Sequence, residues 1–124
     1  MLEKRLGEVE LEIYHIVCRL EEASVQEVVD EISRERQTAY TSVMTLMKNL
    51  SEKGYLGYKK IGKKFIYFPA VNPESLKISL LEKTLDKVFG GSVLDLVQSL
   101  VNSEKIGREE LAEIRQILND LEEE

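Results

Sequence analysis

Hydrophobic residues recur at helical spacing through the first third of the chain. Between Glu8 and Leu20 they lie three or four positions apart, which predicts an amphipathic helix: Val9, Ile13, Ile16, Val17 and Leu20. Ser24 and Glu27 then form a capping box in front of a second apolar stripe: Val25, Val28, Val29 and Ile32. We therefore expect a short second helix, followed by a polar and basic link over residues 34–37.

The stretch QTAYTSVMTLMKNLSEKG, residues 37–54, predicts a third helix that ends before Gly54. One side carries the apolar residues Val43, Leu46, Met47 and Leu50. The opposite side carries short polar side chains and one lysine: Thr38, Thr41, Ser42, Thr45, Lys48 and Asn49. Tyr40 lies at the border between the two sides, where packing and ligand contact are equally open.

This polar face is unusual because Ser and Thr are weaker helix formers than the Glu, Lys, Gln or Arg that exposed positions usually hold. One interpretation is an ordinary solvated face, with Thr38 as the helix cap. The other is that short side chains let the helix approach phosphates and base edges closely in the major groove of DNA. The residues that follow favour the second interpretation.

After Gly54 the pattern changes to β-branched and aromatic residues, in Tyr55–Lys60 and Lys64–Phe68 on either side of Ile61-Gly62-Lys63. This pattern predicts a β-hairpin with a basic tip made by Lys59, Lys60, Lys63 and Lys64. Such lysines can protect a sheet edge from aggregation, or they can contact phosphates without regard to sequence. The aromatic residues Tyr55, Tyr58, Phe65, Tyr67 and Phe68 are expected to pack the hairpin rather than to stack on bases. Three helices followed by a hairpin predict a winged helix-turn-helix over residues 1–71.

Residues 72–124 are predicted to be a helical region. Asn72-Pro73 is typical of a helix start, Gly90-Gly91 breaks that helix near Phe89, and further helices are expected over 92–101 and from Gly107 onward. Their apolar stripes include Leu81, Leu85, Val88, Val93, Val97, Leu100, Leu111, Ile114, Ile117, Leu118 and Leu121. Three helices cannot easily bury so much apolar surface against one another. We expect a homodimer through this region, although folding back as extra core is the alternative.

The charge distribution points to a polyanionic partner. The chain of 124 residues has a net charge of −6, yet residues 34–64 hold eight Lys/Arg against two Asp/Glu. A local basic segment matters more to DNA than the total charge. Arg34 and Arg36, just before the third helix, are therefore further candidates for phosphate contact.

Other function classes find little support in the sequence. There is no Gly-rich phosphate loop, G-x-S-x-G or H-E-x-x-H motif, so no catalytic residue is expected. The single His15 and the single Cys18 are interpreted as structural, and neither a metal site nor a cofactor is expected. No apolar run approaches the roughly 18–20 residues of a membrane span, and the charged start lacks a signal core, so we expect a cytoplasmic protein.

Several stretches together resemble the BlaI/MecI/CopY family of penicillinase-type repressors: LGEVELEIYHIV, SVQEVVDEI, TAYTSVMTLMKNLSEKGYL, FIYFPAV, VFGGSVLDLV and EELAEIRQIL. The resemblance covers nearly the whole chain in order and spacing. It implies a homodimer whose winged helices bind a palindromic operator, typically with TACA/TGTA half-sites, and whose C-terminal helices form the dimer. It also implies a recognition helix at Ala39–Lys53, with Thr41, Ser42 and Thr45 facing DNA and Lys59–Lys64 in the wing.

The chain departs from the family pattern at three places. Members of the family often carry Lys or Arg where this chain has Thr41 and Met44, so its operator preference is expected to differ. It has no Cys after Cys18, whereas copper-responsive members have C-terminal Cys-x-Cys pairs. Antibiotic-responsive members are cut by a sensor protease at an Asn-Phe bond, which the matching segment Val97-Gln-Ser-Leu-Val-Asn-Ser lacks.

The sequence therefore predicts a mainly α, dimeric winged-helix repressor of transcription, with a sensor protease as a conceivable upstream partner. Its predicted contacts with double-stranded DNA are Arg34, Arg36, Thr38, Tyr40, Thr41, Ser42, Thr45, Lys48, Lys59, Lys60, Lys63 and Lys64. The alternative is a winged-helix protein-interaction module that does not bind DNA. That alternative would favour an apolar exposed face on the third helix.

Overall fold

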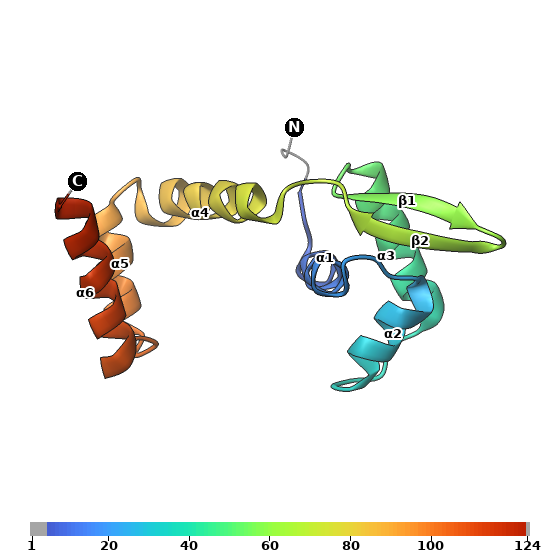
Figure 1. The fold of residues 1–124 in the computed structure, drawn as a ribbon, viewed down its shortest axis with the longest axis horizontal. Helices are drawn as coiled ribbons and strands as arrows, with labels where there is room; N and C mark the ends of the chain where they lie inside the picture. The colour runs from blue at the N-terminus through green and yellow to red at the C-terminus, as the bar shows by residue number, and fades with distance from the viewer. Residues whose placement is uncertain (1–4, 124) are drawn as a thin grey trace. The chain divides into compact units, whose positions relative to one another are not determined.

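The computed structural model describes residues 5–123, and its order of elements is that of a winged helix followed by further helices (Figure 1). The elements are α1 (Glu8–Leu20), α2 (Val25–Ser33), α3 (Tyr40–Glu52), β1 (Leu56–Ile61), β2 (Lys64–Pro69), α4 (Pro73–Phe89), α5 (Val93–Asn102) and α6 (Arg108–Glu122). The predicted fold class is thereby confirmed. The chain divides into two compact units between Ser79 and Leu80. This division lies inside α4, and Leu76 in the early turns of that helix is buried with the first unit.

The core of the first unit lies between α1, α2 and α3. Each helix buries one apolar stripe, and the fully or almost fully buried members are Ile13, Tyr14, Val17, Val28, Ile32, Val43, Met47 and Leu50. The stripes agree with the periodicity in the sequence, except that Leu20 and Leu46 are only half-buried and Val9 is exposed. The phenolic hydroxyl of Tyr14 donates a hydrogen bond to the Val71 carbonyl at 3.1 Å, which attaches the segment after the hairpin to α1.

The ends of α3 differ in how they are capped. Its N-cap is Ala39, which has no side chain that can accept a hydrogen bond from the first turn. Thr38 is therefore not the cap that the solvated-face interpretation requires. After α3, Gly54 adopts a φ of +89°, a left-handed conformation that favours glycine. Tyr55 N–H then donates to the Leu50 carbonyl at 3.0 Å and leads the chain directly into β1.

The hairpin is attached to the helices by a short β-bridge that the sequence did not reveal. β1 and β2 pair antiparallel, with Tyr58 opposite Tyr67. Ala23, in the connection between α1 and α2, exchanges two backbone hydrogen bonds with Tyr67, at 2.9 and 2.8 Å. This third strand-like segment holds the β1–β2 hairpin, which is the wing, beside the helices.

A buried ion pair joins the start of α1 to the end of α3. Lys53 Nζ lies 2.7 and 2.9 Å from the two carboxylate oxygens of Glu10, and the Gly7 N–H donates to Glu10 Oε1 at 2.9 Å. Glu10 is only 6% exposed. Burial by itself raises the pKa of Glu10, but the hydrogen bonds from Lys53 and Gly7 outweigh it, so the pKa lies below its ordinary value.

Helices α4, α5 and α6 start and stop where the sequence predicts. Asn72 Oδ1 accepts a hydrogen bond from Glu74 N–H at 2.8 Å at the start of α4, and Gly90 and Gly91 end this helix with positive φ angles. The Ser92 hydroxyl caps α5. No residue of α5 or α6 in the described chain is buried. Among the helices of residues 5–123, none combines the length and the apolarity that crossing a membrane requires.

The Glu10–Lys53 pair predicts a specific dependence of stability on pH. Replacing Lys53 with Met leaves a buried carboxylate without its cation. Because the Lys53 side chain is itself 28% exposed, we expect the free energy of unfolding at pH 7 to fall by about 2 kcal/mol. Because the parent's Glu10 has a lowered pKa, the contribution of this pair is present above about pH 4.3 and is lost as pH falls below it. The difference in free energy of unfolding between the parent and Lys53→Met should therefore become smaller toward acidic pH. Urea denaturation between pH 7 and pH 3 measures it. A deficit that is independent of pH would contradict this account.

Candidate nucleic-acid interface

The exposed side of α3 is the centre of the candidate interface. Thr41, Ser42, Thr45 and Lys48 are exposed, and Asn49 is half-buried, on the side opposite the buried stripe of α3. The structure thus places these predicted residues together on one accessible face. Tyr40 and Met44 are also exposed, at 47% and 42%. The face is therefore not purely polar, and sequence reasoning left Met44 out of the site.

Intrahelical bonding determines how Thr45 can interact. Its hydroxyl donates to the Thr41 carbonyl at 2.9 Å, one turn earlier. The hydroxyl proton is therefore engaged, and Thr45 presents oxygen lone pairs and a methyl group to the outside. The side chain remains short, as close approach to a DNA groove requires, but in this rotamer it acts as an acceptor rather than a donor.

The four lysines of the wing do not have equivalent surroundings. Lys59 Nζ lies 3.0 Å from a carboxylate oxygen of Glu22. Lys60 is paired with Phe65 across the hairpin, and its ammonium group lies 5.8 Å from the centre of that ring. Lys63 and Lys64 are exposed at the turn. In the described part of the chain, no carboxylate lies within ion-pair distance of Lys60, Lys63, Lys64 or the helix residue Lys48.

Both candidate arginines are bound to carboxylates of their own unit. Arg36 makes two hydrogen bonds to Glu12 of α1, at 2.5 and 2.9 Å, and the pair lowers the pKa of Glu12. Arg34 lies 3.2 Å from Glu31, which Arg19 also contacts. These pairs connect the turn between α2 and α3 to α1 and α2. In this conformation the two arginines have less free charge to offer a phosphate than the unpaired lysines.

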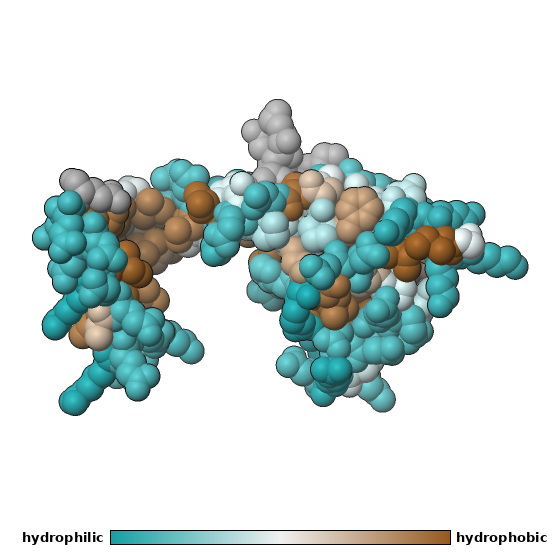
Figure 2. Space-filling view, viewed as in Figure 1, coloured by the Kyte–Doolittle hydropathy of each residue, from teal (hydrophilic) through white to brown (hydrophobic). Residues whose placement is uncertain are grey.

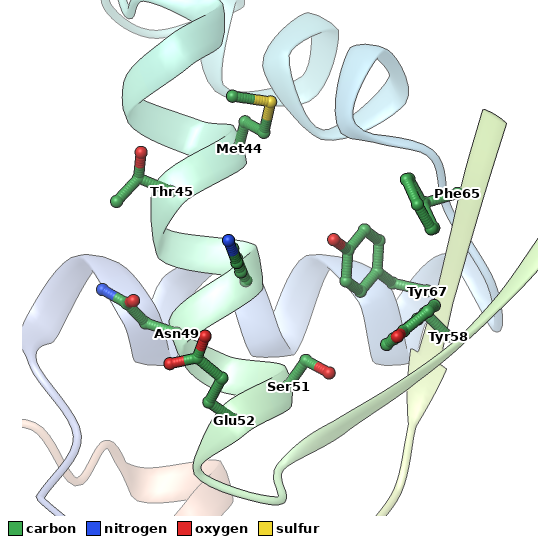
Figure 3. A pocket seen from close by; sticks show the side chains of 9 residues that line it. Met44, Thr45, Asn49, Ser51, Glu52, Tyr58, Phe65 and Tyr67 are labelled. Carbon is green, nitrogen blue, oxygen red and sulfur yellow. The ribbon is translucent and has the colours of Figure 1, made fainter. Parts of the chain in front are cut away.

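A hollow of about 630 Å³ separates α3 from the wing (Figure 3). Its lining residues are Met44, Thr45, Lys48, Asn49, Ser51, Glu52, Tyr58, Phe65 and Tyr67. Tyr55 and Tyr67 are buried, as the packing interpretation of the aromatic residues predicts, but Tyr58 and Phe65 are 55% and 44% exposed. Strand alternation could not signal this difference, because the buried Tyr67 shares one face of the hairpin with Tyr58 and Phe65.

The lone histidine and cysteine lie apart from this surface, on α1. His15 is exposed and Cys18 is half-buried, where burial raises the pKa of its thiol. Residues 5–123 contain no group of three His, Cys, Asp or Glu side chains that could hold a metal ion.

The predicted dimerisation residues form exposed apolar surface on the second unit, seen as brown areas over α4 and α5 in Figure 2. Leu85 and Ile114 are half-buried, and the others are exposed: Leu81, Val88, Val93, Val97, Leu100, Leu111, Ile117, Leu118 and Leu121. Because no residue of α5 or α6 is buried, most of this apolar surface stays exposed within the described second unit.

Comparison with known proteins agrees with this architecture. The family model for the penicillinase repressor matches residues 6–120. The methicillin resistance regulatory protein MecI of Mammaliicoccus sciuri is 29% identical over 114 residues, covering 92% of this chain and 93% of that protein. A penicillinase repressor of Staphylococcus aureus is 25% identical over 112 residues, covering 90% of this chain and 89% of its own.

A solved structure has the same winged-helix fold. The solution structure of the DNA-binding domain of the repressor BlaI superposes with a TM-score of 0.51 at 25% identity, covering 56% of this chain and 84% of that domain. The family model covers nearly the whole chain, and the three helices and the wing agree with a DNA-binding domain of this kind. The protein therefore belongs to the penicillinase repressor family of DNA-binding regulators of transcription.

Proposed function

We propose that the protein represses transcription as a homodimer that binds a palindromic operator. Each α3 enters a major groove, and each wing contacts the flanking backbone, so that the dimer sets the spacing of the two half-sites. The observation that carries the proposal is the exposed face of α3, where short hydroxyl side chains lie opposite a fully buried stripe. Repression then follows from occupation of a promoter.

Within this proposal, the basic residues position the protein on the backbone. Lys48 on α3 and Lys60, Lys63 and Lys64 on the wing supply the phosphate contacts, since no carboxylate of the described chain pairs with them. Lys59, Arg34 and Arg36 are secondary contacts, because each must exchange a carboxylate partner for a phosphate.

Base recognition is assigned to the first half of α3. Thr41, Ser42 and Thr45 face outward, and Thr38 and Tyr40 flank them at the N-terminal end. Because Ala39 provides no side-chain cap, the first N–H groups of α3 lie beside Thr38 with partial positive charge, which favours a nearby phosphate. Thr45 offers an acceptor to a base amino group or its methyl group to a thymine methyl.

The second unit is assigned to dimerisation. Exposed apolar side chains on α4, α5 and α6 need a cover that their own unit does not provide, and a second copy of the same surface is self-complementary across a two-fold axis. Loss of the dimer would release the operator. A sensor protease acting on this region would have that effect, but the segment at residues 97–103 lacks the Asn-Phe pair, so its cleavage site would differ.

The direct test of this function is selection of bound fragments from genomic DNA with the purified protein. We expect enrichment of one shared palindrome located in promoters. Recovery of fragments without a common site would contradict the repressor proposal. It would favour a protein-interaction module, for which the exposed Tyr40 and Met44 would be the apolar contacts.

The roles of Thr45 and Lys63 can be separated by measuring how each variant's affinity for selected and unrelated DNA depends on salt. Thr45→Ala should weaken binding to the selected site by about tenfold while leaving binding to unrelated DNA unchanged, because only a base contact is lost. Lys63→Ala should weaken binding to both DNAs and lower the slope of log affinity against log salt by about 0.9, because one phosphate contact is lost. Both quantities are measured by fluorescence anisotropy between 50 and 300 mM salt, concentrations chosen as roughly physiological. If both variants bound like the parent, this assignment of roles would be wrong.

Dimerisation predicts a difference between two single-charge changes on α6. Ile117→Asp places a carboxylate on the apolar stripe and should raise the dimer dissociation constant at least about tenfold. Arg115→Gln changes the net charge by the same amount at an exposed polar position, and it should leave dissociation unchanged. Sedimentation velocity over a dilution series measures both. Equal dissociation of the two variants would argue against this surface as the dimer interface.

A further inference from the structure

The hollow between α3 and the wing contains apolar surface in the middle of the proposed DNA-binding face. Met44 on α3 and Tyr58 and Phe65 on the wing line it, and each is more than two-fifths exposed. Figure 3 shows Met44 and Phe65 at one end of the hollow and Ser51 and Glu52 at the other. Apolar side chains at this exposure in a surface surrounded by lysines indicate a ligand that is not charged throughout.

The register of the hairpin shows that these side chains continue the core outward. On the face that holds Leu56, Tyr58 and Lys60, the strand partners are Pro69, Tyr67 and Phe65. Leu56 at the base is buried, and Tyr67 is buried while its strand partner Tyr58 is exposed. Phe65, nearer the turn, is also exposed. The rings of Tyr58 and Phe65 pack edge to face, with centroids 5.4 Å apart and planes at 78°, so the two side chains support each other.

Positive and negative side chains are unevenly distributed around the hollow. Lys48 lines it, and Lys60 follows Tyr58 by two positions on the same face of the hairpin. A second, smaller hollow shares Met44, Phe65 and Tyr67 and is bordered by Lys63 and Lys64. Glu52 is the acidic side chain that lines the main hollow, at the end away from Met44 and Phe65. A phosphate is therefore favoured toward the lysines and disfavoured beside Glu52.

The DNA backbone matches a surface that combines an apolar wall with neighbouring lysines. If α3 lies in the major groove and the wing contacts the flanking backbone, one strand must pass between them. That strand alternates anionic phosphates with deoxyriboses, whose C–H groups suit an apolar wall. We propose that the hollow seats the sugar–phosphate backbone of one strand, with deoxyribose carbons against Met44, Tyr58 and Phe65 and the neighbouring phosphates on Lys48 and Lys60. This inference rests on the proposed function. It adds the apolar contact with deoxyribose, which depends neither on the base sequence nor on charge.

Hydroxyl-radical footprinting tests the contact directly, because the radical abstracts hydrogen from deoxyribose. On a duplex carrying the selected site, the parent should protect sugars in two places per half-site: at the major groove and at the backbone step toward the flanking wing. Met44→Ala and Phe65→Ala should lose the second protection. Each should bind both the selected and unrelated DNA about fivefold more weakly, with an unchanged salt slope.

Val9→Ala is the matched control. Val9 is 41% exposed, close to the 42% of Met44, but it lies on α1 outside the proposed DNA-binding surface and does not line the hollow. It should keep the parent's affinity and footprint. Thermal unfolding accompanies each variant, and Met44→Ala carries the test if Phe65→Ala unfolds, because Ala is favourable in a helix.

Three outcomes would overturn the proposal. The first is undiminished sugar protection and affinity in Met44→Ala, and the second is a lowered salt slope like that of Lys63→Ala. The third is an equal loss of affinity and sugar protection in Val9→Ala. A parent that protects no DNA at all would instead refute the proposed function, so the two failures are distinguishable.

Discussion

The burial of one side of α3 is the constraint on which the first unit depends. Val43, Met47 and Leu50 fill the centre of the core, so the direction of this helix is determined by its packing against α1 and α2. Its other side is therefore presented outward in one orientation. The Glu10–Lys53 pair and the Gly54 turn fix the end of the same helix, and the β-bridge at Ala23 places the wing beside it. Both parts of this surface, α3 and the wing, are therefore attached to the core.

Ion pairing divides the basic residues into two groups with different physical roles. Arg34 and Arg36 form short contacts with carboxylates on α1 and α2, and they stabilise the turn that precedes α3. The unpaired lysines on α3 and the wing retain their charge for a ligand. An overall acidic protein can thereby present a basic surface, since its excess of carboxylates lies mainly after residue 72.

Much of the fold could be predicted from the sequence, since its determinants are local. Helical periodicity, the Ser24 capping box, Asn72-Pro73 and Gly90-Gly91 placed the helices, and the change of period after Gly54 placed the hairpin. The Ala23–Tyr67 bridge and the Glu10–Lys53 pair could not be predicted, because each joins residues more than forty positions apart that carry no pattern of their own. The carboxylate partners of Arg36 and Lys59 also lie on other elements of the fold and carry no sequence pattern that identifies them.

For the candidate site, the sequence predicted the exposed face of α3 and the basic wing, but it missed the apolar part. Met44 was not counted, and Tyr58 and Phe65 were assigned to packing, because composition cannot tell a buried aromatic ring from an exposed one. Strand alternation would have placed Tyr58, Lys60 and Phe65 on one face only once the register was known.

The central claim is that α3 and the wing form the DNA-binding surface. It is tested most directly by following the backbone amide NMR signals of the protein while a duplex carrying the selected site is added. We predict the largest shifts at Thr41, Ser42 and Thr45 and along the wing, with small shifts on α1. Shifts concentrated on α1 or α6, with α3 and the wing unaffected, would contradict the account.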